Sequence, residues 1–261
     1  MIMPISYQRK LDGKSNAHLI TFDDGKDYVV KFMQPGFEKS LPNEWVGYCL
    51  GRYLGIPIPF ARIIEIPRDF CEQVPELAEM SESKFQFASL YIPDCKNGHQ
   101  VSIIPQIKNQ QCLAGIIVFD YWLQNRDRTR KNILLHEKAP NVYQLWAIDH
   151  AEVFGSYNWH QNEIEKLPAR LIKSATHQLM ASFIKDEKQF YEQLEIVQTI
   201  PILLIEEIVG LIPDDWNVTK EEKKAMVTAL VTRRQKVLPN LIDRYIKRRY
   251  RPLHKKGKEK I

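Results

Sequence analysis

The chain has 261 residues and a mass of 30.7 kDa, and 44% of its residues are hydrophobic and 26% are charged. These proportions exclude a disordered or low-complexity protein, and the length allows one large domain or two closely packed lobes with a cleft between them. The net charge of +5 does not indicate a general nucleic-acid-binding surface, because residues 247–260 alone carry +7 and leave −2 for the rest.

The basic tail, residues 247–261, is expected to be a solvated and frayed terminus. Such a tail could also contact RNA, an anionic lipid surface or an acidic partner. No apolar run is long enough to cross a membrane, and the N-terminus lacks the apolar segment of a secretory signal. The cysteines are scattered without a C-x-x-C pair, which favours reduced thiols. We therefore expect a cytoplasmic protein without a transmembrane segment.

Two short strands joined by a tight turn are predicted near the N-terminus. Residues 17–22 and 28–33 are apolar-rich runs, and the Asp-Asp-Gly-Lys sequence between them is a strong hairpin signal. Residues 12–16, just before this hairpin, form a turn of small and polar residues that includes Gly13 and Ser15. Backbone N–H groups of such a turn can point outward, so this segment could cradle a phosphate.

One helix and two further strands complete a small predicted sheet. The helix is expected over residues 44–54, with Ser40 or Asn43 as its N-cap, and a Gly-Ile-Pro-Ile-Pro sequence ends it. Strands are expected at 61–66 and 85–92, where a proline ends the second one. The N-terminal part is therefore predicted to be rich in β-structure.

A buried helix, a polar loop and a second hairpin are predicted next. Residues 111–124 are dense in apolar side chains, which favours a largely buried helix. The charged loop 125–132 leads into strands at 133–135 and 143–148, and Asp149 lies where the second of these strands ends. The hairpin folds the chain back, so the loop and Asp149 are expected to converge.

The remainder of the chain shows the apolar periodicity of helices, at residues 179–183, 190–197, 202–211 and 226–246. We therefore predict an α+β protein with a two-lobed arrangement. Residues 1–93 would form a small β-rich N-lobe, residues 94–246 a mainly helical C-lobe, and residues 247–261 the basic tail. A ligand is expected at the junction of the two lobes.

Asp127, Asn132 and Asp149 form the main candidate for chemistry. Phosphoryl transfer needs a carboxylate that orients the acceptor hydroxyl and oxygen ligands that hold magnesium against the phosphates. Asp127 suits the first role, and Asn132 with Asp149 suits the second. The alternative is that Asp127 pairs with a neighbouring arginine and that Asp149 caps a turn. The order and context of all three residues together favour the metal site.

Lys31 and Glu44 form a second candidate pair. Lys31 stands on an apolar strand, where an ammonium could bind the α and β phosphates of a nucleotide. Glu44, in the first turn of the following helix, could anchor it through an ion pair. Taken alone, Lys31 is better explained as a lysine on the solvent face of an edge strand, and Glu44 could simply suit the helix dipole.

Several of these motifs resemble those of HipA-like kinases. The N-terminal resemblance rests on Gly13-Lys14-Ser15, Tyr28-Val29-Val30-Lys31-Phe32, Asn43-Glu44 and Leu54-Gly55-Ile56-Pro57-Ile58-Pro59. The second part rests on Asn125-Arg126-Asp127-Arg128 through Asn132, followed by Ala147-Ile148-Asp149-His150, and these segments are also similar to type II phosphatidylinositol 4-kinases. The resemblance covers residues 10–155 by motif.

The resemblance implies a protein-kinase-like fold with ATP and Mg²⁺ as cofactors. It implies that Asp127 is the catalytic aspartate, that Asn132 and Asp149 are magnesium ligands, and that Lys31 binds the nucleotide phosphates. It also implies a hinge at Leu90, Tyr91 and Ile92 whose backbone would bind adenine. Thr129 departs from the family pattern, because HipA proteins commonly carry histidine there.

The sequence therefore predicts an ATP- and Mg²⁺-dependent phosphotransferase, foremost a HipA-like Ser/Thr protein kinase with protein substrates. The resemblance also suggests a toxin-antitoxin setting with an antitoxin-like protein partner. Two alternatives stay open: a lipid or small-molecule kinase of the same fold, and a catalytically silent nucleotide-binding module that recruits a partner.

Overall fold

A five-stranded antiparallel sheet forms most of the N-terminal part of the chain, in a computed structural model that describes residues 2–78, 80 and 83–258. The strand order is β1-β2-β3-β5-β4, formed by β1 (Pro4–Lys10), β2 (His18–Phe22), β3 (Asp27–Lys31), β4 (Ala61–Glu65) and β5 (Phe85–Leu90). The predicted hairpin is β2–β3. Strand β1 was not predicted, because as an edge strand it leaves most of its residues exposed and shows no apolar alternation.

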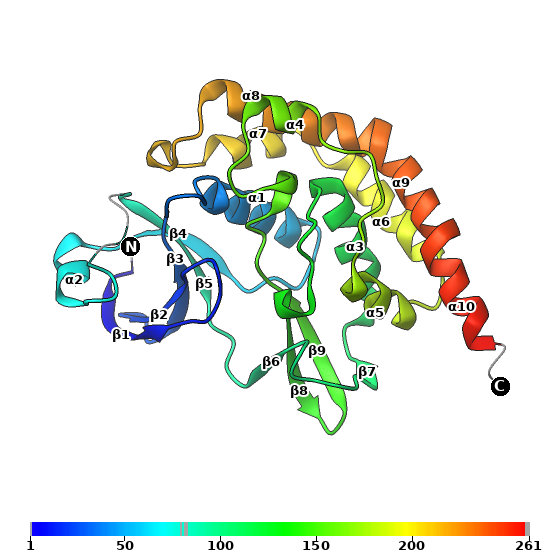
Figure 1. Cartoon of the computed structure of the whole chain (residues 1–261), viewed down its shortest axis with the longest axis horizontal. Coiled ribbons are helices and arrows are strands. Elements are labelled where there is room, and N and C mark those ends of the chain that lie inside the picture. Colours follow the sequence, from blue (N-terminus) through cyan, green and yellow to red (C-terminus); the bar gives the residue numbers. More distant parts are fainter. Residues whose placement is uncertain (1, 79, 81–82, 259–261) are drawn as a thin grey trace.

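Helix α1 (Ser40–Tyr53) follows this sheet and begins one turn before the predicted start. Its N-cap is Lys39, without a side-chain hydrogen bond, so the prediction that Ser40 or Asn43 caps the helix is wrong. Most of the helix is buried, because it packs against β5 on one side and against α7 (Ile202–Gly210) on the other. Figure 1 shows α1 between the sheet and the C-terminal helices.

A second sheet lies at the junction, with the order β6-β8-β9-β7. The predicted second hairpin is confirmed as β8 (Ile133–Ala139) and β9 (Val142–Ala147), with a longer first strand than expected. The short strands β6 (Cys95–Asn97) and β7 (Gln106–Ile107) flank it and were not predicted, since runs of two or three residues carry no detectable pattern.

The C-terminal part is mainly helical, as predicted. Helix α3 (Leu113–Leu123) is buried along its whole length. The other helices are α2 (Arg68–Gln73, in the N-terminal part), α4 (Gln161–Glu165), α5 (Ala175–Phe183), α6 (Lys188–Thr199), α8 (Lys220–Thr232), α9 (Leu238–Tyr245) and α10 (Arg251–Lys258). The α+β class is therefore confirmed. Within the described ranges, the structure contains no helix with the length and apolar character needed to cross a bilayer.

The basic tail is not frayed where the structure describes it. Two π-helical turns, Arg233–Val237 and Ile246–Tyr250, join α8, α9 and α10 into one long rod along the edge of the molecule (Figure 1). Tyr250 is buried, and its hydroxyl donates to the carbonyl of Ile184 at 3.0 Å. The prediction of a frayed tail was wrong because Tyr250 and Leu253, which stand among the charged residues, pack against the core. Residues 259–261 lie outside the described residues.

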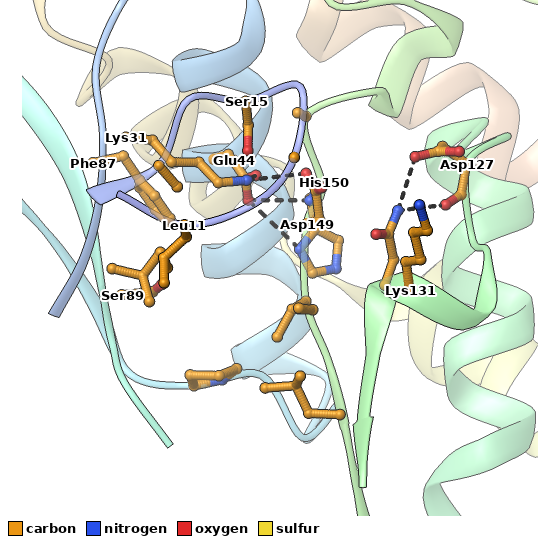
Figure 2. A pocket seen from close by; sticks show the side chains of 18 of the residues that line it. Leu11, Ser15, Lys31, Glu44, Phe87, Ser89, Asp127, Lys131, Asp149 and His150 are labelled. Atoms are coloured by element: carbon orange, nitrogen blue, oxygen red, sulfur yellow. Dashed lines mark hydrogen bonds and ion pairs between the residues drawn. The ribbon is translucent and has the colours of Figure 1, made fainter. Parts of the chain in front are cut away.

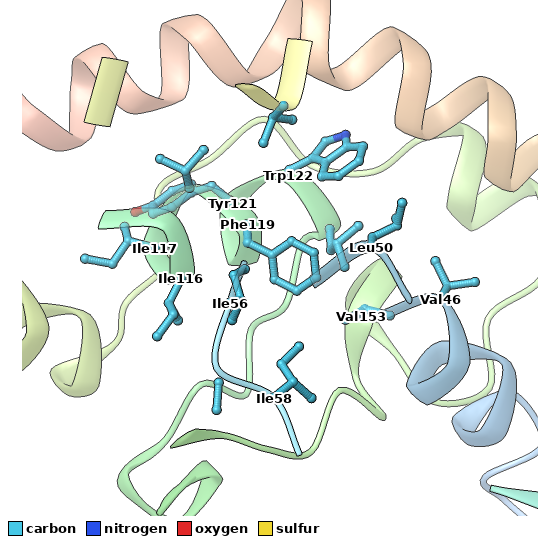
Figure 3. Packing of buried hydrophobic residues seen from close by; sticks show 14 of the residues in the cluster. Val46, Leu50, Ile56, Ile58, Ile116, Ile117, Phe119, Tyr121, Trp122 and Val153 are labelled. Atoms are coloured by element: carbon cyan, nitrogen blue, oxygen red, sulfur yellow. The ribbon is translucent and has the colours of Figure 1, made fainter. Parts of the chain in front are cut away.

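The main hydrophobic core joins α1 to the helical part. Figure 3 shows Phe119 of α3 packed among Val46 and Leu50 of α1 and Ile58 of the segment that follows. A smaller cluster of buried side chains belongs to the five-stranded sheet and the region around α2. Because α1 shares its core with the C-terminal part, the elements around the junction are held in fixed positions.

Candidate active site

A cavity of about 780 Å³ lies at the junction of the two parts. Residues of the first sheet, α1, the polar loop and the end of β9 line it. The structure brings all the predicted site residues together on its walls: Gly13, Ser15, Lys31, Glu44, Leu90, Tyr91, Ile92, Asp127, Asn132 and Asp149. Lys14, Thr129, Lys131 and Glu152 also line the cavity and were not predicted as site residues.

Lys31 forms an ion-paired cluster with two carboxylates. Its Nζ lies 2.5 Å from Oε1 of Glu44 and 3.0 Å from Oδ1 of Asp149. Figure 2 shows the three side chains pointing toward one another from β3, α1 and the end of β9. Strand β3 is the central strand of its sheet, so the alternative of a solvent-facing lysine on an edge strand is wrong.

Burial and the neighbouring charges shift the pKa values of all three groups. Burial by itself lowers the pKa of Lys31, but the charges of Asp149 and Glu44 outweigh it and raise that pKa above its usual value. Burial acts to raise the pKa of Asp149, and the Lys31 ammonium reverses this and lowers it to about 2. The pKa of Glu44 is raised, because burial and the charge of Asp149 outweigh the attraction of Lys31.

Asp149 adopts a left-handed backbone conformation, with a φ of 58°. Such a conformation costs about 1–3 kcal/mol for a residue other than glycine and persists only when its surroundings enforce it. Two hydrogen bonds hold the flanking peptides. The backbone N–H of His150 donates to Oε2 of Glu44 at 3.1 Å, and Arg128 Nη1 donates to the carbonyl of Ile148 at 2.7 Å.

A close approach of α1 also fixes this segment. A Cβ placed on Gly47 would lie 2.6 Å from Cβ of His150, so only glycine leaves room for the contact. The buried Asn43 side chain donates to the carbonyls of Ala151, Val153 and Ser156 at 2.6–3.1 Å and accepts from Trp159 at 2.8 Å. Trp159 is therefore part of the packed core.

Asp127 and Asn132 are joined on the loop that precedes β8. The amide nitrogen of Asn132 donates to the backbone carbonyl of Asp127 at 2.7 Å and to its Oδ2 at 2.8 Å. Burial raises the pKa of Asp127, the Asn132 hydrogen bond opposes this, and the charge of Asp149 adds to the rise. Among the described residues no ion pair joins Asp127 to an arginine, so that alternative is wrong.

The oxygen donors of the loop and hairpin fit a magnesium ion. Within the described ranges no three His, Cys, Asp or Glu side chains gather as a metal cage. Magnesium needs no such cage, because it is usually held by one or two protein oxygens together with substrate phosphates and water. Asn132 uses its amide nitrogen for Asp127, so its side-chain oxygen is not needed for that contact, and Asp149 supplies a carboxylate.

A buried ionic network lies beneath the loop and was missed. Asp120, on α3, pairs with Arg128 through Nε at 2.9 Å and Nη2 at 3.1 Å, and with His177 Nε2 at 2.9 Å. The Asp120 and Arg128 side chains are both 0% exposed. A charged residue in the middle of the apolar 113–123 helix was the available signal, since a buried charge requires a partner.

The predicted hinge begins at Leu90, the last residue of β5. The backbone N–H of Leu90 donates to Phe60 at 2.7 Å, and that of Tyr91 donates to Asp27 at 2.9 Å. In the part of the chain that the structure describes, the N–H of Ile92 has no hydrogen-bond acceptor. Of the three hinge residues, all of which line the cavity, Ile92 is therefore the one whose N–H donates no hydrogen bond within the described chain.

Comparisons with known proteins agree with this architecture. The crystal structure of the Helicobacter pylori proinflammatory kinase CtkA is similar with a TM-score of 0.61 at 14% identity, covering 93% of this chain and 96% of that one, which shows a shared kinase-like fold. The Golgi casein kinase with Mn/ADP bound has a TM-score of 0.49 at 14% identity, covering 94% of this chain and 74% of that one.

The Shewanella oneidensis MR-1 HipA structure, a complex with HipB and operator DNA, has a TM-score of 0.44 at 11% identity, covering 93% of this chain and 73% of that one. A search of curated protein sequences found no match. The profile of the HipA-like kinase family matches residues 3–248, which is nearly the whole chain. The chain therefore belongs to the HipA-like kinase family.

Proposed function

We propose that this kinase transfers phosphate from ATP, with Mg²⁺, to Ser or Thr hydroxyls of protein substrates. The observation that carries the proposal is the convergence of Lys31, Glu44, Asp127, Asn132 and Asp149 on one cavity. A cation, an oxygen-donor pair and a separate carboxylate are the three parts that phosphoryl transfer requires.

Lys31 would bind the nucleotide phosphates. Its raised pKa keeps the ammonium charged, and Glu44 fixes its direction through the 2.5 Å contact. The Gly13 to Ser15 turn lines the same cavity and supplies backbone N–H groups for the phosphates. Among the hinge residues we assign the adenine contact to the uncommitted N–H of Ile92.

Asn132 and Asp149 would hold the metal. Bound Mg²⁺ supplies positive charge that neutralises the phosphates as the reaction proceeds. The low pKa of Asp149, about 2, keeps its carboxylate ionised. Asn132 has its amide nitrogen engaged by Asp127, which leaves its oxygen as the ligand atom.

Asp127 would orient the acceptor hydroxyl and accept its proton. It lies across the cavity from Lys31 and Glu44 in Figure 2, where an acceptor can approach the end of the nucleotide. Its raised pKa suits a general base, because a base works best when its pKa is nearer to the working pH.

A cytoplasmic location is proposed from the thiols. All four cysteines are free, and burial raises the pKa of Cys49 to about 12, which leaves that thiol unreactive. Free thiols are typical of a reducing compartment. Family membership is also the reason to propose an antitoxin-like protein partner, which co-purification with the tagged protein from its native cells would identify.

The decisive test follows transfer of radiolabelled phosphate from ATP, with Mg²⁺, to the protein itself and to lysate proteins. Asp127→Asn should lower the rate about 10²- to 10⁴-fold, the usual contribution of a general base. Asp69→Asn, at an exposed position on α2, is the matched control and should behave as wild type.

The position of the label decides between acceptors. Phosphoserine or phosphothreonine in the labelled protein would support the proposal. Label found only in the lipid fraction would favour the lipid-kinase alternative instead. Equal labelling by wild type and Asp127→Asn would contradict the proposal. Thermal stabilisation by Mg-ATP without any labelling would also contradict it and would indicate a silent nucleotide-binding module.

A further inference from the structure

Arg128 occupies a central place beneath the proposed metal site. Its Nη1 donates to the backbone carbonyl of Asn132 at 2.9 Å and to that of Ile148 at 2.7 Å. One nitrogen atom therefore binds the peptide of one proposed metal ligand and the peptide that leads into the other, Asp149. Arg128 Nη2 also lies 3.1 Å from Nε2 of His150, the residue that follows Asp149.

Asp120 holds the guanidinium in place. Both of its oxygens accept from Arg128, and they also contact the amide of Asn125 and the ring of His177, each at 2.9 Å. Burial would raise the pKa of Asp120, but the Arg128 charge outweighs it and keeps the carboxyl ionised. A planar guanidinium with two bonds to a fixed carboxylate cannot turn, so the direction of Nη1 is set by α3.

The spacing of the two proposed metal ligands depends on this atom. Asn132 immediately precedes β8 and Asp149 follows β9, and the strand pairing brings their peptides close, with the Ile148 N–H bonded to the Asn132 carbonyl at 3.1 Å. Arg128 Nη1 binds the carbonyls on both sides of that contact. It also holds the peptide that precedes the left-handed Asp149.

We propose that Arg128 is a positioning residue that sets the separation of Asn132 and Asp149 and thereby the affinity of the site for its divalent cation. The inference rests on the proposed function, because it takes these two residues as the metal ligands. Arg128 itself touches neither the cavity nor the reacting groups. Groups that orient metal ligands are commonly worth 10- to 100-fold in metal affinity.

A purely structural role would look different. An ion pair that only held the fold together would, when lost, lower stability without changing the concentration of metal that the enzyme needs. Arg233 provides a matched control for that case. It is also buried and donates to the carbonyls of Tyr121 and Trp122 at the end of α3, but none of its contacts involves Asn132 or Asp149.

The experiment compares Arg128→Lys with Arg233→Lys in the full-length protein. Lysine keeps the charge beside Asp120 but cannot bridge both carbonyls while it holds the carboxylate. For each protein, MgCl2 is titrated at fixed ATP, and both phosphate transfer and the thermal shift are measured. ATP binding is measured separately in EDTA.

For Arg128→Lys we expect the half-saturating Mg²⁺ concentration to rise about 10- to 100-fold in both readouts. ATP affinity in EDTA should change less than about threefold, since no bond of Arg128 reaches the predicted phosphate or adenine contacts. Arg233→Lys should lower Tm and leave the half-saturating Mg²⁺ concentration at the wild-type value. An unchanged Mg²⁺ requirement in Arg128→Lys, beside a lowered Tm, would overturn the inference.

Two further comparisons keep the result unambiguous. If Arg128→Lys does not fold, Asp120→Asn takes its place, because it frees the guanidinium while keeping the shape of its partner, and it should raise the Mg²⁺ requirement in the same way. Wild type alone tests the proposed function: if it shows no Mg²⁺-dependent binding or transfer, that function fails and the inference with it. If wild type depends on Mg²⁺ but Arg128→Lys has the same Mg²⁺ requirement as wild type, only the inference about Arg128 fails and the proposed function stands.

Discussion

Gly47→Ala should destabilise the protein and lower its activity, against the usual rule that alanine stabilises helices more than glycine does. In the interior of a helix, alanine is favoured over glycine by about 1 kcal/mol. At Gly47 the added Cβ would lie 2.6 Å from Cβ and 2.9 Å from Cγ of His150. Carbon atoms normally approach to about 3.5–4.0 Å, so α1 and His150 must separate by about 1 Å.

The magnitude follows from that displacement. Overpacking of a well-packed core costs about 1–3 kcal/mol, which the gain in helix propensity offsets only in part. His150 adjoins Asp149 and donates to Glu44, so the shift reaches the Lys31 cluster directly. A misplacement of about 1 Å can lower a catalysed rate about 10²-fold.

Gly210 offers a matched control on α7, because a Cβ there would meet no atom within 4 Å. Urea unfolding and phosphate transfer are measured for wild type, Gly47→Ala and Gly210→Ala. We expect Gly210→Ala to equal or exceed wild type in stability with full activity. If Gly47→Ala were as stable and as active as wild type, the close approach of α1 to His150 would not constrain the site, and the reasoning would be refuted.

Three further predictions follow from other contacts. Lys31→Met should lower phosphate transfer by at least about tenfold and raise the KM for ATP, because it removes the predicted phosphate contact and leaves Glu44 and Asp149 unpaired. Steady-state kinetics with varied ATP measures both effects. An unchanged KM and kcat would count against the predicted role of Lys31. His18 is buried, and burial first and then the charge of Lys10 lower its pKa from 6.5 to about 4. The unfolded chain therefore binds a proton between those pH values that the folded protein does not, so stability should fall as pH drops through this window, and His18→Gln should flatten that part of the curve of unfolding free energy against pH. Tyr250→Phe should cost about 1 kcal/mol in urea unfolding and Tyr250→Ala about 3–5 kcal/mol, whereas a solvated tail would make both changes silent.

Local patterns in the sequence were sufficient for the elements that carry the site. The β2–β3 and β8–β9 hairpins are marked by turn residues between apolar runs, and α3 by its apolar density. Since Lys31, Asn132 and Asp149 stand at or just beyond the ends of these elements, their gathering on one cavity follows from the element order. Edge strand β1 and the short strands of the second sheet were not predicted, because they form by pairing with neighbouring strands and carry no pattern of buried residues.

The partner of Arg128 shows why the rest could not be predicted. On the loop, the sequence places Arg128 beside Asp127, and an ion pair between neighbours was the local alternative. In the folded chain Arg128 turns inward to Asp120, eight residues earlier. That choice depends on desolvation: a buried carboxylate on α3 gains far more from the guanidinium than a carboxylate that faces the cavity. The packing around Asp120 determines which carboxylate pairs with Arg128, and that packing is a tertiary property that local sequence does not show.

The placement of α1 has a consequence for how such a kinase is controlled. To draw Glu44 away from Lys31, the helix would have to leave Phe119 and the other core side chains it shares with the C-terminal part. Moving α1 would therefore expose buried core side chains, so it would cost free energy in the way that local unfolding does. The structure has the Lys31–Glu44 pair assembled. Regulation that spares the core would have to act at the mouth of the cavity, by deciding which nucleotides and acceptors enter.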